Sequence, residues 1–96
     1  MKKTYFSFNL QTSFLREGDK FIAYAPALDL STSGDTYEQA KKRFKEVVEI
    51  FFEEILNKGT LNEVLEDLGW KKINAQWQPP LVVGQESRTI NVPLYN

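Results

Sequence analysis

The feature that most constrains the fold is a helical repeat of apolar residues in the middle of the chain. Seven apolar residues recur there at the three- and four-residue spacing of an α-helix and fall within about a 100° arc. A helix that is apolar on one side must bury that side against another layer. The segment therefore predicts a long helix lying across a sheet. The stripe consists of Tyr37, Ala40, Phe44, Val47, Val48, Phe51 and Ile55.

Both ends of this helix are marked by local signals. Thr36 followed by Gln39 has capping-box spacing, which predicts that the helix begins at Tyr37. Gly59 suits a left-handed C-terminal cap and predicts the end. Thr60 and Glu63 then repeat the capping-box spacing, so we expect a second, short helix through Leu68.

The segments around the long helix have the two-residue alternation of strands. Residues 5–14 alternate strictly and predict a half-buried strand, followed by a Gly-containing turn at 16–19 and a returning strand at 20–25. A loop containing Pro26 leads to a short third strand at "LSTS". Residues 70–77 alternate again and predict a fourth strand.

These elements together predict an α+β fold. We expect an antiparallel three- to four-stranded sheet with one long helix packed on one face, in the order β-β-β-α-short α-β. The chain divides into an α+β domain at residues 1–78 and a C-terminal tail at residues 79–96, separated by a stiff break at Pro79-Pro80.

The tail is too regularly patterned for a disordered terminus, and we expect it to form a strand. An unpaired apolar strand promotes association, and symmetric pairing with another copy gives a closed assembly. We therefore predict a homodimer or a tetramer. The expected contacts are Ile90, Val92 and Leu94, with Arg88 at the rim of the interface.

Composition excludes most catalytic designs. The 96-residue chain has no histidine and no cysteine, which removes the usual general base, the thiol nucleophile and the common metal ligands. Its formal charge of −1 gives no global attraction to nucleic acid. No apolar run approaches the roughly 20 residues of a membrane helix, and the first fourteen residues lack the apolar run of a signal peptide. We expect a cytoplasmic protein without membrane contact.

Three acidic residues precede or open the long helix and permit two interpretations. Asp29, Asp35 and Glu38 could hold Mg²⁺ in a carboxylate-dependent nuclease, because hard cations take carboxylate oxygens. Alternatively, they are turn and cap residues, with Glu38 complementing the helix dipole. We favour the second interpretation, since each residue has a local role, and we predict no catalytic residue, no metal and no cofactor.

A basic run at residues 41–45 and two apolar residues further along the helix raise the question of a binding surface. On a helix the basic side chains share their face with glutamates, so no contiguous surface for nucleic acid forms. Phe52 and Leu56 lie on an edge of the helix away from the main stripe. They either pack under the second helix or form an exposed contact for another chain.

The centre of the chain, "YAPALDLSTSGDTYEQA", resembles the HicB family of antitoxins, specifically their N-terminal partial RNase-H-like domain. The resemblance covers residues 5 to about 70. Gln39 stands where the family has a glutamate and keeps the capping geometry. The matching positions are Tyr24, Pro26, Leu28, Gly34, Thr36 and Ala40.

The resemblance implies a non-catalytic protein that binds a small basic messenger-RNA-cleaving toxin of the HicA type and masks its active site. Members often carry a second, DNA-binding domain. No helices follow residues 87–96, so we do not expect direct DNA binding. An orphaned domain of this family that only self-associates or regulates another partner fits the sequence equally well.

Overall fold

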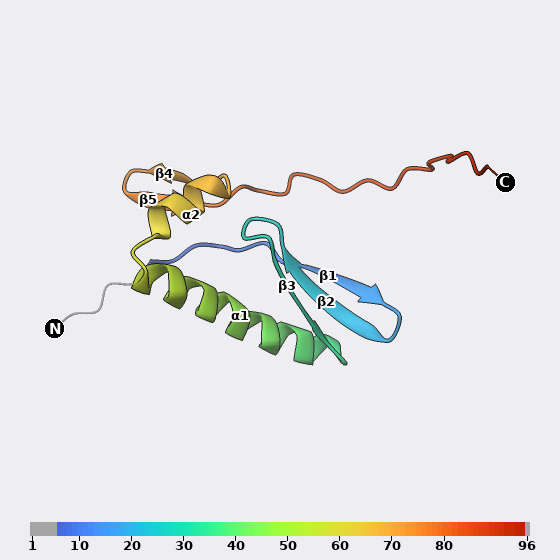
Figure 1. Ribbon diagram of the computed structural model, residues 1–96, viewed down its shortest axis with the longest axis horizontal. Helices are drawn as coiled ribbons and strands as arrows, with labels where there is room; N and C mark the ends of the chain where they lie inside the picture. Colours follow the sequence, from blue (N-terminus) through green and yellow to red (C-terminus); the bar gives the residue numbers. More distant parts are fainter. Residues whose placement is uncertain (1–5, 96) are drawn as a thin grey trace.

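The computed structural model describes residues 6–95 and has the predicted α+β architecture (Figure 1). An antiparallel three-stranded sheet in the order β1-β2-β3 is followed by a long helix, a short helix and a separate two-stranded sheet. The strands of the first sheet are β1 (Ser13–Glu17), β2 (Lys20–Ala25) and β3 (Leu30–Gly34). The later elements are α1 (Tyr37–Asn57), α2 (Leu61–Asp67), β4 (Lys71–Ile73) and β5 (Gln76–Gln78).

The helix α1 packs on the sheet through small residues. Ala23 and Ala25 of β2 are fully buried against Ala40 and Phe44 of α1. At the end of β3 the two elements are closest, because a Cβ added at Gly34 would lie 2.5 Å from the backbone nitrogen of Ala40. A glycine is therefore required there by the close approach of the helix.

The start of α1 is capped by side chains, as predicted. The Thr36 hydroxyl accepts a hydrogen bond from the Gln39 amide at 3.0 Å. The Gln39 side-chain carbonyl in turn accepts from the Asp35 amide at 2.6 Å, one residue earlier than in an ordinary capping box. The first bond satisfies a backbone donor that a helix start would otherwise leave unpaired, and the second fixes the residue before the cap.

A second core forms where α2 and the β4–β5 hairpin meet the loop between β2 and β3. Trp70 follows α2 and donates its indole N–H to the Ala27 carbonyl at 2.7 Å. Leu28 of the same loop and Leu65 of α2 are buried beside it. Trp77 of β5 closes this core, so the C-terminal elements are attached to the sheet by its loop rather than by strand pairing.

The first predicted strand is wrong in position. Of the predicted range 5–14, only Ser13 and Phe14 belong to β1, and residues 6–12 are extended without a strand partner; Tyr5 lies outside the described residues. The turn at Gly18, which has a φ of +61°, pairs Glu17 with Lys20, and the pairing ends with Ser13 opposite Tyr24. The alternation of residues 6–12 still reports burial, because Phe8 and Leu10 pack against the hydrophobic core.

The predicted fourth strand is also wrong. Residues 71–78 form the hairpin β4–β5, which belongs to a separate sheet. Asn74 and Ala75 make the turn with φ values of 51° and 64°, the conformation of a two-residue type I′ turn. Alanine is rare at such a position, so the sequence lacked the usual signal for a hairpin.

The cap predicted for the second helix is absent. No side chain caps the start of α2, and the Thr60 hydroxyl instead donates to the Ile55 carbonyl at 3.5 Å. Thr60 is still the N-cap residue of α2, because its carbonyl accepts from the Val64 amide at 3.0 Å, but its side chain bonds back to α1. The helix α2 ends at Asp67, one residue before the predicted end.

The tail contains no helix or strand in residues 79–95 (Figure 1). Two hydrogen bonds join it to the fold: the Gln11 side chain donates to the Val82 carbonyl at 3.4 Å and accepts from the Val82 amide at 2.6 Å. The radius of gyration is 17.0 Å, against about 13 Å for a compact chain of 100 residues. The predicted tail strand does not form within a single chain, and its pairing with another chain stays a prediction.

Leu65 is fully buried in the second core, so its truncation should destabilise the protein strongly. We expect Leu65→Ala to cost about 2–5 kcal/mol of unfolding free energy, through lost burial and the cavity left behind. Ile50→Ala, on the exposed face of α1, should stay within about 0.5 kcal/mol. Urea unfolding measures both, and equal losses would show that the core lies elsewhere.

The two threonines at the predicted helix starts should respond differently to truncation. Thr36→Ala removes an observed cap, and its expected cost is about 0.5–2 kcal/mol. Thr60→Ala removes only a long hydrogen bond to a carbonyl and should cost less. Thermal unfolding of the two variants provides the comparison, and a larger loss for Thr60→Ala would contradict the assigned caps.

Candidate protein-interaction surface

The three acidic residues of the proposed metal site have separate partners. The Tyr24 hydroxyl donates to Asp29 Oδ1 at 3.1 Å, Asp35 pairs with Lys20, and Glu38 pairs with Lys41 at 3.4 Å. Among residues 6–95 no group of three or more potential metal ligands gathers. The structure therefore does not bring Asp29, Asp35 and Glu38 together as the nuclease interpretation requires.

Two of these contacts perturb the ionisation of exposed groups. The hydrogen bond from Lys20 and its positive charge lower the pKa of Asp35 below its ordinary value. The hydrogen bond to Asp29, with partial desolvation and the carboxylate charge, raises the pKa of Tyr24. Both directions follow from local pairing at the surface.

The outward side of the C-terminal half of α1 is acidic and has an apolar centre. Ile50 is 62% exposed and lies among four glutamates on this side of the helix. A shallow hollow of about 470 Å³ adjoins it, lined in part by Asn57 and Lys58. We call this surface the acidic face and define it by Glu46, Glu49, Ile50, Glu53 and Glu54.

The charges of the acidic face are not explained by helix stability. They lie toward the negative end of the α1 dipole, where basic residues are favoured, and the last turn of α1 contains none. Among residues 6–95, Glu54 is the one glutamate of this face with an ion pair, to Lys58 just beyond the helix at 2.7 Å, and the hydrogen bond from Lys58 and its charge lower the pKa of Glu54. The other three glutamates make no ion pair within that range, so their charge can attract a positively charged partner.

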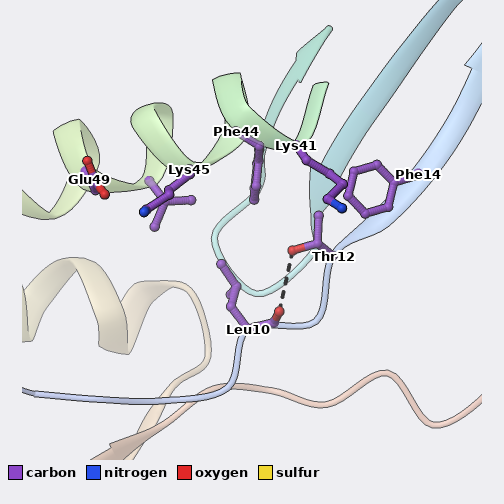
Figure 2. A pocket seen from close by; sticks show the side chains of 8 residues that line it. Leu10, Thr12, Phe14, Lys41, Phe44, Lys45 and Glu49 are labelled. Carbon is purple, nitrogen blue, oxygen red and sulfur yellow. Dashed lines mark hydrogen bonds between the residues drawn. The ribbon is translucent and has the colours of Figure 1, made fainter. Parts of the chain in front are cut away.

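A second surface is a groove between α1 and the extended N-terminal segment. Its narrow part, with a volume of about 300 Å³, lies between residues 10–14 and the first half of α1, and Figure 2 shows Leu10 and Thr12 below it and Phe44 and Lys45 above. Its wide part, with a volume of about 1080 Å³, is lined by α1, the β4–β5 hairpin, the start of α2 and residues 6–8. Val48 and Glu49 line both parts, so the two hollows are neighbours along α1, and we call them together the α1 groove.

Phe52 and Leu56, the two residues with alternative roles, both line the wide part of the α1 groove. Phe52 is half-buried and stacks on Phe8, with ring centroids 5.3 Å apart, and on Trp70 at 6.4 Å. Leu56 is 56% exposed. Phe52 therefore packs into the fold, whereas Leu56 is available for contact with another chain.

The tail residues expected at an interface are exposed in the single chain. Ile90, Val92 and Leu94 are 73%, 69% and 90% exposed. Arg88 pairs with Glu86 at 3.3 Å. Figure 1 shows this end of the chain leading away from α1 and the sheet, so the structure does not bring these residues to the α1 groove of their own chain.

Sequence reasoning missed the acidic face and the groove for different reasons. Ile50 was detectable, because it is the one apolar residue placed among the glutamates on the polar side of the helical repeat. The groove was not, since it requires the extended path of residues 6–12 and the hairpin position, and both depend on contacts distant in sequence.

Comparisons with known proteins identify no relative. No family model matches the chain, and searches of curated proteins and of solved structures found no match. Within residues 6–95, neither α1 nor α2 has the length and apolar character needed to cross a bilayer. The resemblance to the HicB family therefore depends on the motif residues alone.

The ion pair between Lys20 and Asp35 predicts a pH-dependent contribution to stability. The folded-state pKa of Asp35 is depressed, so the contribution is present above the unfolded value of 3.8 and is lost as pH falls through the folded value. Lys20→Met should raise the pKa of Asp35 and lower the thermal midpoint near neutral pH, with the difference from wild type shrinking in acid.

A carboxyl NMR titration and thermal scans across the acidic range measure both effects. Lys42→Met removes the same charge at an exposed position and serves as the control. An Asp35 pKa that is unchanged in Lys20→Met would contradict this assignment.

Proposed function

We propose that the chain is a non-catalytic protein-binding module that binds a small basic protein on the acidic face of α1. The observation that carries this proposal is the exposed Ile50 surrounded by glutamates. An apolar centre with a polar rim is the usual arrangement of a protein interface. The rim is negatively charged, so it selects a partner of positive charge.

The resemblance to the HicB family suggests the kind of partner. In that family the partner is a small basic toxin of the HicA type, whose messenger-RNA-cleaving site the antitoxin masks. A basic RNA-cleaving protein must bind phosphates, so its active site is positively charged and complementary to a surface of glutamates. We infer that the acidic face covers such a site and that the chain acts as an antitoxin.

The test is binding to the small basic protein encoded by a gene adjacent to this one. We expect a stable complex on co-expression, and rescue of growth when that protein is toxic. Glu46→Lys/Glu54→Lys should weaken the complex by about tenfold or more, because like charges would then face each other across the interface. Isothermal titration calorimetry measures the loss, and added salt should weaken the wild-type complex in the same direction.

The matched control is Glu63→Lys/Glu66→Lys on α2, which changes the net charge equally at exposed positions outside the acidic face. Its affinity should remain close to wild type after correction for salt. Equal losses in the two double variants would show that only net charge matters. An adjacent basic protein that neither binds nor is neutralised would overturn the antitoxin assignment.

Self-association is a second candidate, favoured by one specific observation. The tail carries alternating apolar residues that are 69–90% exposed, and a folded chain rarely leaves such a segment unpartnered. In a self-associating regulatory domain, a second copy of the chain would cover these apolar residues, and no different partner would be needed. The α1 groove provides a place for that contact.

A further inference from the structure

We propose that residues 86–94 of a second copy lie as a strand in the α1 groove, so that two copies exchange tails. The groove runs along one side of α1 and is bounded on its other side by the N-terminal segment. The tail is extended, alternates apolar residues and makes no helix or strand of its own. Tail exchange is an event separate from the binding of a basic partner, because the groove shares only Glu49 and Glu53 with the acidic face and the occupant is the tail.

The backbone of the N-terminal segment is unpaired and available to an incoming strand, although the Gln11 side chain already holds Val82 of the same chain. Residues 6–12 continue directly into β1, yet the described part of the chain contains no backbone-to-backbone hydrogen bond from them. Unpaired extended backbone of this kind is a template for strand addition. The opposite edge of the sheet is partly covered, since Arg43 donates to the Ser33 carbonyl of β3 at 3.1 Å.

The lengths of groove and tail agree. Lys41 and Leu56 mark the two ends of the groove on α1, and the fifteen residues between these positions rise about 22 Å. An extended segment from Glu86 to Leu94 spans about 26 Å. One tail therefore fills the groove from end to end.

The alternation of the tail also fits the groove. Ile90, Val92 and Leu94 point to one side of an extended chain, because every second residue of a strand shares a face. The central and narrow parts of the groove present apolar side chains, including Val48 and Phe44 of α1. Pro93, between Val92 and Leu94, points to the other face of the strand. It has no backbone N–H, so it fits a position where the strand makes no hydrogen bond through its amide.

Charge selects the direction of the tail. The wide part of the groove contains Lys72 with two carboxylates, Glu49 and Glu53, whereas the narrow part contains Lys41 and Lys45 with Glu49 alone. Glu86 and Arg88 share the face of the apolar residues, and Arg88 has more opposite charge beside it when the two enter the wide part first. Leu94 then lies at the narrow end beside Phe14 and Lys41, and the tail runs parallel to the N-terminal segment.

The tail of the same chain does not reach this position by continuing its observed path. Val82 is held at Gln11 by two hydrogen bonds. Ile90 lies eight residues beyond Val82, whereas β1 ends at Glu17, six residues beyond Gln11. The alternating segment therefore runs past the end of its own sheet edge, and another copy is its nearest source of a groove.

Exchange between two copies closes the assembly. Each copy donates one tail and accepts one, so a two-fold dimer leaves neither groove empty. The three residues between Val82 and Glu86 bridge at most about 14 Å. The two grooves must consequently lie side by side.

The absence of cysteine from the sequence makes a disulfide test direct. Leu94→Cys and Lys41→Cys are made in separate full-length proteins, mixed and oxidised. We expect a disulfide-linked heterodimer, because the proposed contact brings the two positions to the Cα separation of about 4.4–6.8 Å that a disulfide needs. The matched control is Leu94→Cys mixed with Leu56→Cys, at the other end of the groove, which should link poorly.

Three other results would each contradict the proposal. Preferential linkage of Leu94→Cys to Leu56→Cys would contradict the direction of the tail. No linkage to either position would exclude the groove as its binding place. A chain carrying both Leu94→Cys and Lys41→Cys that closes on itself as a monomer would show that the tail folds back within one copy.

Tail substitutions test the same contact through the molecular mass. Ile90→Asp/Val92→Asp should shift sedimentation velocity profiles from dimer to monomer and weaken association at least about tenfold, because two apolar side chains would be replaced by charges. Val83→Asp, at a position 99% exposed, is the control and should remain dimeric. All three positions are exposed in the single chain, so the fold should be retained, and circular dichroism checks it.

A wild-type protein that is monomeric at all concentrations would overturn the proposal, as would a dimer that resists the double tail substitution. The latter result would indicate direct pairing of sheet edges. These outcomes are separate from those for the basic partner, because Glu46 and Glu54 do not line the groove and the tail does not contribute to the acidic face.

Discussion

The arrangement of the whole molecule depends on the buried hydrogen bond from the Trp70 indole to the Ala27 carbonyl, 2.7 Å long. It joins positions 43 residues apart and connects the loop between β2 and β3 to the segment after α2. A buried carbonyl without a partner is costly, and so is a buried indole N–H. Because this one bond satisfies both, α2 and the β4–β5 hairpin are held beside the sheet without strand pairing. The hairpin then forms the far wall of the wide part of the α1 groove through Lys72 and Trp77.

Sequence reasoning succeeded where local interactions determine a boundary. The helix α1 begins at Tyr37 because the Thr36 hydroxyl and the Gln39 amide are close in sequence and pair directly. The strand β2 matches its predicted range of residues 20–25, since it is limited by a glycine turn on one side and by Pro26 on the other. The apolar stripe was correct in part: Ala40, Phe44 and Ile55 are buried and three further members are half-buried, whereas Tyr37 is 44% exposed. These features need no knowledge of distant parts of the chain.

Failures occurred where alternation alone was used to place a strand. Alternation reports which side of an extended segment is buried, but not what lies beside its backbone. Residues 6–12 alternate because Phe8 packs on Trp70 and Phe52, aromatic contacts that involve residues far away in sequence. In the hairpin, the turn at Asn74 and Ala75 reverses a chain whose alternating pattern continues on both sides. The same limitation hid the groove, whose walls come from four separate segments.

Glu49 couples the two proposed binding events, because it belongs to the acidic face and also lines both parts of the α1 groove. A basic protein on the acidic face would reduce the negative potential that attracts Arg88 of an exchanged tail, and the tail would reduce the potential available to the basic protein. Such a coupling free energy is reciprocal, so each event must weaken the other by the same factor at equilibrium. The effect is limited to the two shared carboxylates, Glu49 and Glu53, both exposed, which restricts it to the modest energies of surface ion pairs. Partner binding would therefore adjust tail exchange without abolishing it, unless the two partners overlap sterically at these glutamates.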